Sequence, residues 1–499
     1  MADPELTLSP IADSPRVLFA TNFLPAKGHF GTLVVNYALL DYLVQSGCTV
    51  HVCCFGRYGF DRPTISLDGE EVGPWTISLT GYAHTSEHRF HRLPEFRLLD
   101  LMVQVFRKLR LGRVVALSNA LLTGAKTYVA NMSARPFFAL IARVILKLRL
   151  ARVAVRSNAL LTGSETFVAN MGAKPFCAAP DFFDKRHFVR CLSHFSPHCV
   201  IVDYAFLSPL LELVEKGSSR TLRMILTHDL VCRRVESLRS RGLPDELAWD
   251  DNEEARQLRR ADALLVERED ESAVFQALAP ASRVLVTPLA VRPRRAHGSE
   301  VPGRCLFVGS GGAINEDGLG WFLDEVWPHV LAVRREASLA VCGTVCDHFM
   351  SDKESHRFPS VVWRGAVGSL DEDYASAQVC VVPLLAGSGF KTKLIEALSY
   401  GKVVVTTAVG AQGIGELESP PVLVANDAPA FRRALVEALA GDELRRKMAQ
   451  RAVAYVERHL DPHRLYGPVV EMVYKHCGKG RSAIHWRMQH ALHGDDLAE

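Results

Sequence analysis

The chain has 499 residues, of which 48% are hydrophobic and 23% are charged, with a formal net charge of +3. That length exceeds what one hydrophobic core supports, so we expect two domains plus tails, and the small net charge gives no indication of a nucleic-acid partner. The first residues lack a signal-peptide pattern, and no apolar run reaches the roughly 18 residues of a membrane span.

The amino-terminal part of the chain is predicted to form an α/β domain over residues 15–291, after a tail at 1–14. An apolar strand is followed by a glycine loop, a helix to about Gln45 and a second apolar strand. Strands that alternate with helices in this way are typical of a doubly wound parallel sheet. The predicted strands cover 16–22, 49–55, 199–204, 222–228, 262–267 and 283–289.

A second domain of the same class is predicted over residues 304–460, after a polar, turn-rich linker at 292–303. Its strands are expected at 305–309, 338–343, 360–365, 379–384, 402–407 and 421–426, and its helices at 317–334, 372–377, 391–399 and 429–459. A helix at 461–477 is expected to return to the first domain before a polar tail at 478–499. Two Rossmann-like domains that face each other place a ligand cleft between the carboxyl ends of their sheets.

The first domain contains a tandem duplication. Residues 108–139 and 147–178 are identical at 22 of 32 positions, and a single repeated pair is too little for a solenoid. The overlapping stretch 101–164 has eleven Lys or Arg and no Asp or Glu. Its amphipathic part, at 140–156, has two interpretations: a helix that packs on its own domain, or one that makes peripheral contact with an anionic membrane surface.

The stretch from Gly387 to Gly413 is the most informative part of the sequence. A small, flexible loop precedes a helix that ends at Gly401, and an apolar strand follows at once. A helix N-terminus binds anions through its unpaired N–H groups and its dipole. Lys393 and Glu396 lie three positions apart, on one helix face. They are either a surface ion pair or, as we favour in this context, ligands for the phosphate and hydroxyl groups of a nucleotide sugar.

This stretch and its neighbours resemble the donor half of the group 1 glycosyltransferases, which are retaining enzymes of the GT-B fold. The resemblance rests on LFVGSGG, GWFLDEVWP, VVPLLAGSGFKTKLIEALSYGKVVVTT and GAQGI, and more loosely on VDY, THD and ADALLV in the first domain. It implies a metal-independent hexosyltransferase that acts in polysaccharide or glycolipid biosynthesis. The sugar of a nucleotide diphosphate sugar would pass, with retention of configuration, to a hydroxyl of a saccharide or lipid-linked acceptor.

The resemblance also implies roles for individual residues. Glu396 would bind the donor ribose, Lys393 the diphosphate and His228 the donor sugar, with His228 and Lys393 as the catalytic residues. Further donor-binding positions are Ser388, Gly389, Gly309, Ser310, Gly365 and Val367, and a first-domain glycine loop with Gly28 and Gly31 would close over the site. Two departures stand out: the loop at Gly309 and Ser310 lacks the family's arginine, and Ser388 replaces the first of two glutamates.

No metal or cofactor is expected. Asp371 and Asp373 are interpreted as a helix start, because Ser369 and Glu372 form a capping-box pattern, and Cys342 and Cys346 as core residues. The twelve cysteines form no C-x-x-C pair, which favours reduced thiols and a cytoplasmic protein. We expect this protein to be free in the cytoplasm or bound peripherally to the inner face of the membrane. Because Ser388 departs from the family, a non-catalytic or weakened nucleotide-sugar-binding protein stays open, as does a GT-B sugar epimerase.

Overall fold

The computed structural model describes most of the chain outside the duplicated region. The basic stretch at 101–164, nearly all of the two repeats and Gly28 lie outside the described ranges, so the interpretations placed on them stay predictions. The ranges are 14–23, 31–55, 64–66, 74–79, 82–86, 89–92, 177, 179–214, 221–294, 298–350, 357–414 and 419–478.

The first domain is built on a seven-stranded parallel sheet of order β10-β9-β8-β7-β1-β2-β4. Helices cover both faces of such a sheet, so its strands are mainly apolar, and every residue of β7 is buried. The strand order reverses between β1 and β7, which creates a crevice at their carboxyl ends. The strands are β1 Arg16–Thr21, β2 Thr49–Cys54, β4 Thr76–Leu79, β7 Cys199–Asp203, β8 Leu222–Leu226, β9 Ala263–Val266 and β10 Arg283–Val286.

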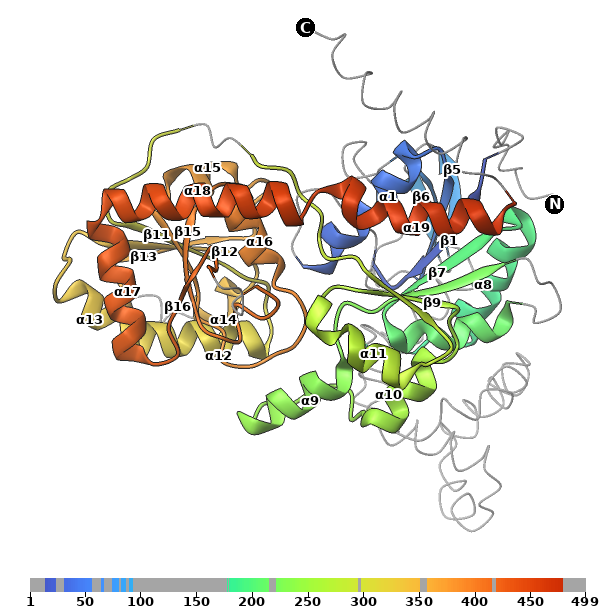
Figure 1. The fold of residues 1–499 in the computed structure, drawn as a ribbon, viewed down its shortest axis with the longest axis horizontal. Helices are drawn as coiled ribbons and strands as arrows, with labels where there is room; N and C mark the ends of the chain where they lie inside the picture. Colours follow the sequence, from blue (N-terminus) through green and yellow to red (C-terminus); the bar gives the residue numbers. More distant parts are fainter. Residues whose placement is uncertain are drawn as a thin grey trace, which may run out of the picture.

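The second domain has a six-stranded parallel sheet of order β13-β12-β11-β14-β15-β16. Here the reversal lies between β11 and β14, which gives a second crevice. The strands are β11 Arg304–Val308, β12 Ser338–Cys342, β13 Val361–Gly365, β14 Val379–Val382, β15 Val403–Thr406 and β16 Leu423–Val424. Two doubly wound sheets confirm the predicted α/β class, and Figure 1 shows the two domains side by side.

Helices surround both sheets (Figure 1). Those that accompany the first sheet are α1 Thr32–Gln45, α8 Phe182–Phe195, α9 Val231–Ser240, α10 Asp251–Leu258 and α11 Ser272–Leu278, with 3-10 turns at Ala205–Leu213 and Glu269–Glu271. Those that accompany the second sheet are α12 Ala313–Trp321, a π-helical segment at Phe322–Val326, α13 Trp327–Leu331, α14 Cys346–Phe349, α15 Asp371–Ser376, α16 Thr392–Ser399, α17 Ala428–Ala440 and α18 Asp442–His459.

The single helix predicted at 429–459 is wrong, because the chain forms two helices there. The break is at Gly441, which has an extended backbone with φ −102° and ψ 96°. Glycine costs about 1 kcal/mol relative to alanine inside a helix. Asp442 and Glu443 begin α18, where the helix dipole favours negative charge.

The carboxyl-terminal helix, α19 Pro462–His476, leaves the second domain and lies against α1 of the first (Figure 1). The rings of Tyr42 and Tyr466 are 5.7 Å apart, and the Tyr474 hydroxyl donates to the Ser46 carbonyl at 2.9 Å. The helix therefore connects the two domains by packing as well as by sequence.

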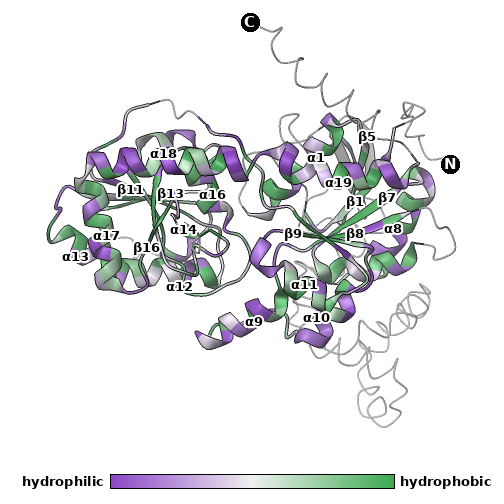
Figure 2. Cartoon of the chain, in the orientation of Figure 1, coloured by the Kyte–Doolittle hydropathy of each residue, from purple (hydrophilic) through white to green (hydrophobic). Residues whose placement is uncertain are grey.

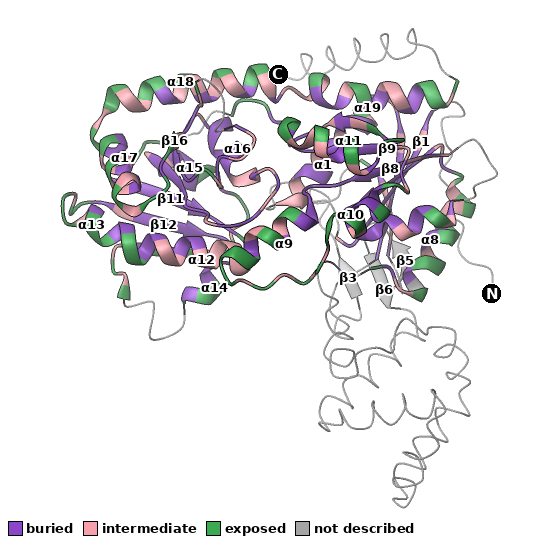
Figure 3. Cartoon of the chain, turned by 60° about the horizontal axis from the view of Figure 1, so that its bottom comes forward, coloured by how far each residue is buried: buried purple, intermediate pink, exposed green. Residues whose placement is uncertain are grey.

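The core lies between the sheets and their helices. Figure 2 shows apolar strands and two-sided helices, and Figure 3 shows buried strands with exposed positions on the outer helix faces. The strand ends are different, since three buried polar residues lie there: Asp203 ends β7, His228 follows β8 and Glu267 follows β9. Within the described residues, none of the helices combines the length and apolar character that crossing a membrane requires.

Candidate active site

A cavity lies where the two domains meet, at the carboxyl ends of β11 and β14. Its volume is about 190 Å³, or about 660 Å³ when the adjoining space that is open to solvent is included. Its lining residues are Gly31, Val308, Gly309, Ser310, Ile314, Asn315, Leu384, Gly387, Ser388, Phe390, Lys391, Thr392, Lys393 and Glu396. The structure thus brings together six of the predicted site residues: Gly31, Gly309, Ser310, Ser388, Lys393 and Glu396.

Two helices point their N-termini at this cavity. Ile314 and Asn315 belong to the first turn of α12, and Thr392 and Lys393 to the first turn of α16. Neither N-cap residue caps its helix with a side chain, although Glu316 of α12 accepts from the Gly312 N–H at 2.9 Å. Uncapped first-turn N–H groups and two helix dipoles make this wall of the cavity attractive to an anion.

Lys393 is held at the cavity wall by uncharged partners. Its Nζ donates to the Asn315 side-chain oxygen and lies 4.9 Å from the centre of the Phe307 ring. No carboxylate forms an ion pair with Lys393 in the part of the chain that the structure describes. Burial, reinforced by the nearby charge of Lys391 and opposed by Glu396, lowers the pKa of Lys393 to about 7.

Asn315 connects Lys393 to the loop that follows β11. Its side-chain nitrogen donates to the Ser310 carbonyl at 2.8 Å and to the Ser310 hydroxyl at 3.3 Å. The loop lacks the arginine that the family resemblance implies, and Asn315 was not among the residues predicted from the sequence. The available signal was its position in the first turn of the helix after Gly312, because first-turn side chains face whatever the N-terminus binds.

Glu396 lies one turn further along α16 and is buried. Burial raises the pKa of its carboxyl group to about 7, while the positive charges of Arg294 and Lys393 oppose that rise. Among the described residues, the structure gives this carboxylate no hydrogen-bond partner. The alternative of a surface ion pair with Lys393 does not fit, because Glu396 is buried and the Lys393 ammonium donates to Asn315.

The loop before α16 contacts the first domain directly. The Gly387 N–H donates to the Ser237 hydroxyl at 3.0 Å, and the Ser388 hydroxyl donates to an Asp229 carboxylate oxygen at 3.2 Å. Gly389 has a φ of +76°, and a Cβ added there would lie 2.7 Å from the His228 carbonyl oxygen. Only glycine fits this close approach between the domains.

Lys391, which the sequence analysis missed, fixes the shape of that loop. Its Nζ donates to the carbonyls of Ser388 at 2.8 Å and Gly389 at 2.7 Å, and to the Gln412 side chain at 3.0 Å. Burial, followed by the charge of Arg268, lowers its pKa to about 8. Lys391 could have been found from the sequence, because it lies two residues before Lys393 and therefore at the N-cap of α16.

His228 occupies a different position from the one predicted. Its Nδ1 lies 2.7 Å from Glu267 Oε1 and its Nε2 2.7 Å from Asp203 Oδ1, and it does not line the cavity. Burial alone favours the neutral imidazole, but the hydrogen bonds to Asp203 and Glu267 prevail and raise the pKa of His228 to about 10. Because both ring nitrogens are bonded to carboxylates, His228 has no ring nitrogen left for a donor sugar. Its backbone carbonyl lies against Gly389.

The remaining predicted positions lie away from the cavity. Gly365 ends β13 and Val367 follows it, two strands from β11, and neither belongs to the lining. Among the acidic residues read as a helix start, Asp371 does begin α15, and Asp373 binds Arg364 at 3.1 Å. The capping box with Glu372 is wrong, because Ser369 lies one residue before the N-cap and accepts from the Asp371 N–H at 3.2 Å.

The second-domain side of the cavity lies in a region that matches a known protein family. Residues 302–441 match the model of the family described as Glycosyl transferases group 1. A curated protein of Klebsiella pneumoniae, an uncharacterized 44.6 kDa protein in the cps region, is 23% identical over 173 residues. That match covers 33% of this chain and 44% of the relative, so the chain spans less than half the length of the curated protein it matches.

Solved structures resemble this chain over nearly its whole length. Sucrose-phosphate synthase from Thermosynechococcus elongatus has a TM-score of 0.54 at 15% identity, over 93% of this chain and 99% of that one. An alpha,alpha-trehalose-phosphate synthase from Burkholderia xenovorans has a TM-score of 0.53 at 13% identity, over 92% of this chain and 99% of that one. Anabaena HepE, solved in complex with UDP-glucose, has a TM-score of 0.51 at 9% identity, over 92% of this chain and 99% of that one. Identities this low show the fold alone, which is GT-B.

Proposed function

We propose that this GT-B protein, whose second domain is a group 1 glycosyltransferase domain, transfers a sugar from a nucleotide diphosphate sugar to an acceptor hydroxyl. The observation that carries the proposal is the cavity itself. A lysine that has no carboxylate partner among the described residues and a buried glutamate meet two helix N-termini there, at the strand-order reversal of the second sheet. Doubly wound sheets bind their ligands at such reversals.

The chemistry of the two side chains fits the two ends of a nucleoside diphosphate. The Lys393 ammonium and the N–H groups of α12 and α16 would attract the diphosphate. The Glu396 carboxylate, three residues along the same helix, would accept hydrogen bonds from ribose hydroxyls. Asn315 would keep Lys393 directed into the cavity through its bond to the lysine ammonium.

The difficult step of the reaction is the departure of the nucleoside diphosphate. Lys393 and the helix N-termini would stabilise the negative charge that develops on its phosphate oxygen, which is electrostatic catalysis. We propose retention of configuration, in which this oxygen takes the proton of the acceptor hydroxyl as the new glycosidic bond forms on the same face. The scheme uses residues of the protein alone, with no metal or cofactor. His228 has a positioning role, because its backbone meets Gly389 across the domain interface.

One observation favours a weaker variant of this function. Ser388 stands where the family has a glutamate, and its hydroxyl is bonded to Asp229 across the interface. A protein that binds the donor without transferring the sugar would keep Lys393 and Glu396. Release of nucleoside diphosphate distinguishes the two, because a binding protein releases none, and a GT-B epimerase would instead change the sugar.

The direct test of binding is a thermal-shift panel of UDP-, GDP-, ADP- and TDP-sugars. A ligand that binds only the folded state at about 100 times its Kd stabilises by about 2.7 kcal/mol. We expect at least one donor to raise the unfolding temperature of the wild type and of Lys447→Ala, an exposed lysine on α18, but not of Lys393→Ala. If no nucleotide sugar shifts the wild type, the proposal fails.

Donor affinity is expected to fall as the pH rises above 7. The pKa of Lys393 is about 7 in the free protein, and a bound diphosphate favours the charged ammonium, so binding takes up a proton. Deprotonation of Lys393 is expected to lower the donor affinity by up to about tenfold per pH unit. Calorimetric titrations between pH 6 and 9 measure it, and comparison with Lys393→Ala separates it from Glu396. Equal slopes in both proteins would contradict the assignment.

Ser388→Ala is expected to change donor kcat/KM by less than about tenfold. Its hydroxyl contributes one hydrogen bond between the domains, and such a bond is worth about 1 kcal/mol. Steady-state kinetics beside Lys393→Ala provide the comparison. A loss as large as that of Lys393→Ala would mean that Ser388 contacts the donor.

A further inference from the structure

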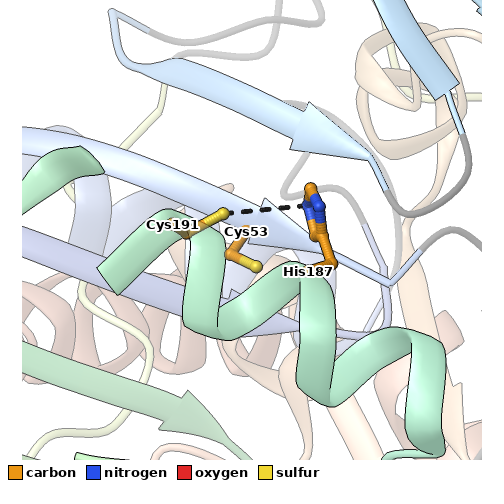
Figure 4. A group of neighbouring side chains, drawn as sticks. All are labelled: Cys53, His187 and Cys191. Carbon is orange, nitrogen blue, oxygen red and sulfur yellow. Dashed lines mark hydrogen bonds between the residues drawn. The ribbon is translucent and has the colours of Figure 1, made fainter. Parts of the chain in front are cut away.

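A second group of side chains with ligand chemistry lies in the first domain, away from the donor cavity. Cys53, His187 and Cys191 offer two sulfur atoms and one imidazole nitrogen that all lie within 4.8 Å of one another (Figure 4). None of the three lines the donor cavity. Cys53 and Cys191 are buried, and His187 is half-buried at the edge of the group, which leaves a route from solvent.

The local structure fixes this arrangement. His187 and Cys191 are four residues apart on α8, so they share one face of the helix. Cys53 belongs to β2, and both cysteines lie in the same hydrophobic cluster as Phe188 and Leu18. Packing of α8 on the sheet therefore brings the cysteine of the strand under the two ligand-type side chains of the helix, as Figure 4 shows.

The separations suit a tetrahedral metal ion. Bonds of about 2.3 Å to sulfur and 2.1 Å to nitrogen place neighbouring ligand atoms roughly 3.5–3.8 Å apart. Cys191 Sγ lies 3.8 Å from His187 Nε2. Because all three ligand atoms lie within 4.8 Å, side-chain movements of about 1 Å or less would complete three corners of the tetrahedron.

Polar side chains of β2 and β4 lie beside the three ligand-type residues. The Ser78 hydroxyl lies 3.2 Å from Cys191 Sγ, and His51 Nε2 lies 3.0 Å from that hydroxyl. His51 Nδ1 in turn lies 2.7 Å from the Thr76 hydroxyl. A hydroxyl or a water at the fourth corner would thus be oriented by His51, and such outer partners strengthen metal sites.

We propose that Cys53, His187 and Cys191 bind a thiophilic divalent cation of the zinc class, which ties β2 to α8. Thiolate and imidazole ligands favour zinc over magnesium or calcium, whose preferred ligands are oxygen atoms. The alternative is that two thiols and an imidazole simply pack together. The proposal departs from the expectation of no metal, which rested on other residues: Cys342, Cys346, Asp371 and Asp373.

The test uses the full chain, purified under reducing conditions, stripped with a chelator and titrated with Zn²⁺ and then Co²⁺. We expect one ion per chain and, with Co²⁺, a thiolate-to-metal charge-transfer absorption. His187→Ala and Cys191→Ser should each weaken Zn²⁺ binding at least about 100-fold, the upper limit seen for outer-partner changes. The control is Cys232→Ser on α9, because Cys232 and Cys191 are both 7% exposed, and it should bind like the wild type.

Three results would overturn the proposal. They are a Co²⁺ complex without the charge-transfer absorption, equal Zn²⁺ binding by wild type and variants, and a Cys53–Cys191 disulfide, seen as the loss of two hydrogens, that persists under reducing conditions. Metal-free wild type and variants are compared by circular dichroism, so that loss of folding is not mistaken for loss of a ligand. If a variant fails to fold, the Co²⁺ spectrum of the wild type still decides.

Discussion

Lys393→Ala is expected to lower donor kcat/KM by about 10²–10³-fold, the range found when one preorganised donor to a developing anion is removed. The structure gives the reason, because Lys393 is a cavity-facing cation that no carboxylate neutralises in the described part of the chain. Steady-state assays of nucleoside diphosphate release measure the effect. Most of the loss should appear in kcat, since the charge on the leaving group is largest in the transition state.

The matched control is Lys447→Ala, which removes an exposed lysine from α18. The kcat/KM of this variant should stay within about twofold of the wild-type value. Glu396→Gln keeps the size of the side chain and is expected to act mainly on KM, because a ribose held by this carboxylate would be bound alike in the ground and transition states. Unchanged donor kinetics in both Lys393→Ala and Glu396→Gln would mean that the cavity takes no part in the reaction.

The second large effect concerns stability. His228→Gln is expected to destabilise the protein by about 3–5 kcal/mol, because it leaves the buried carboxylates of Asp203 and Glu267 without their shared cation. Chemical denaturation monitored by circular dichroism measures the change. His348→Gln, which alters a side chain that is 52% exposed, should cost less than about 0.5 kcal/mol.

The pH dependence gives this prediction a sign. The pKa of His228 is about 10 in the folded protein, above the unfolded value of about 6.5, so its contribution to stability is complete below pH 6.5. That contribution is lost as the pH rises from 6.5 to 10. The stability difference between wild type and His228→Gln should therefore shrink over this window, and a difference that grows would refute the charged pair.

The fold was predictable because its signals are local. Apolar runs such as 199–204 and 379–384 became the buried strands β7 and β14, and the loop, helix and strand of 387–407 appeared in order. The strands that the sequence patterns missed lack such apolar runs. The edge strand β4 Thr76–Leu79 and the antiparallel strands β3 Thr64–Ser66, β5 Tyr82–Ser86 and β6 Arg89–Arg92 are short and rich in polar residues.

The site was predictable where it lies within one segment. Lys393 and Glu396 reach the cavity because helical spacing alone places them on one face of α16. Asn315 and the network of His228 with Asp203 and Glu267 depend on side chains that are 25 to 78 positions apart in sequence. No local pattern shows that His228 has both ring nitrogens occupied, so its predicted contact with the donor sugar could only be tested in three dimensions.

The most direct test of the central claim is the release of nucleoside diphosphate from a panel of nucleotide sugars, with and without saccharide and lipid-linked acceptors. We predict that at least one donor is consumed by the wild type and by Lys447→Ala, that an acceptor accelerates its consumption, and that Lys393→Ala releases at least about 100-fold less. The account is contradicted if a donor binds, yet wild type and Lys393→Ala release its nucleoside diphosphate at the same rate.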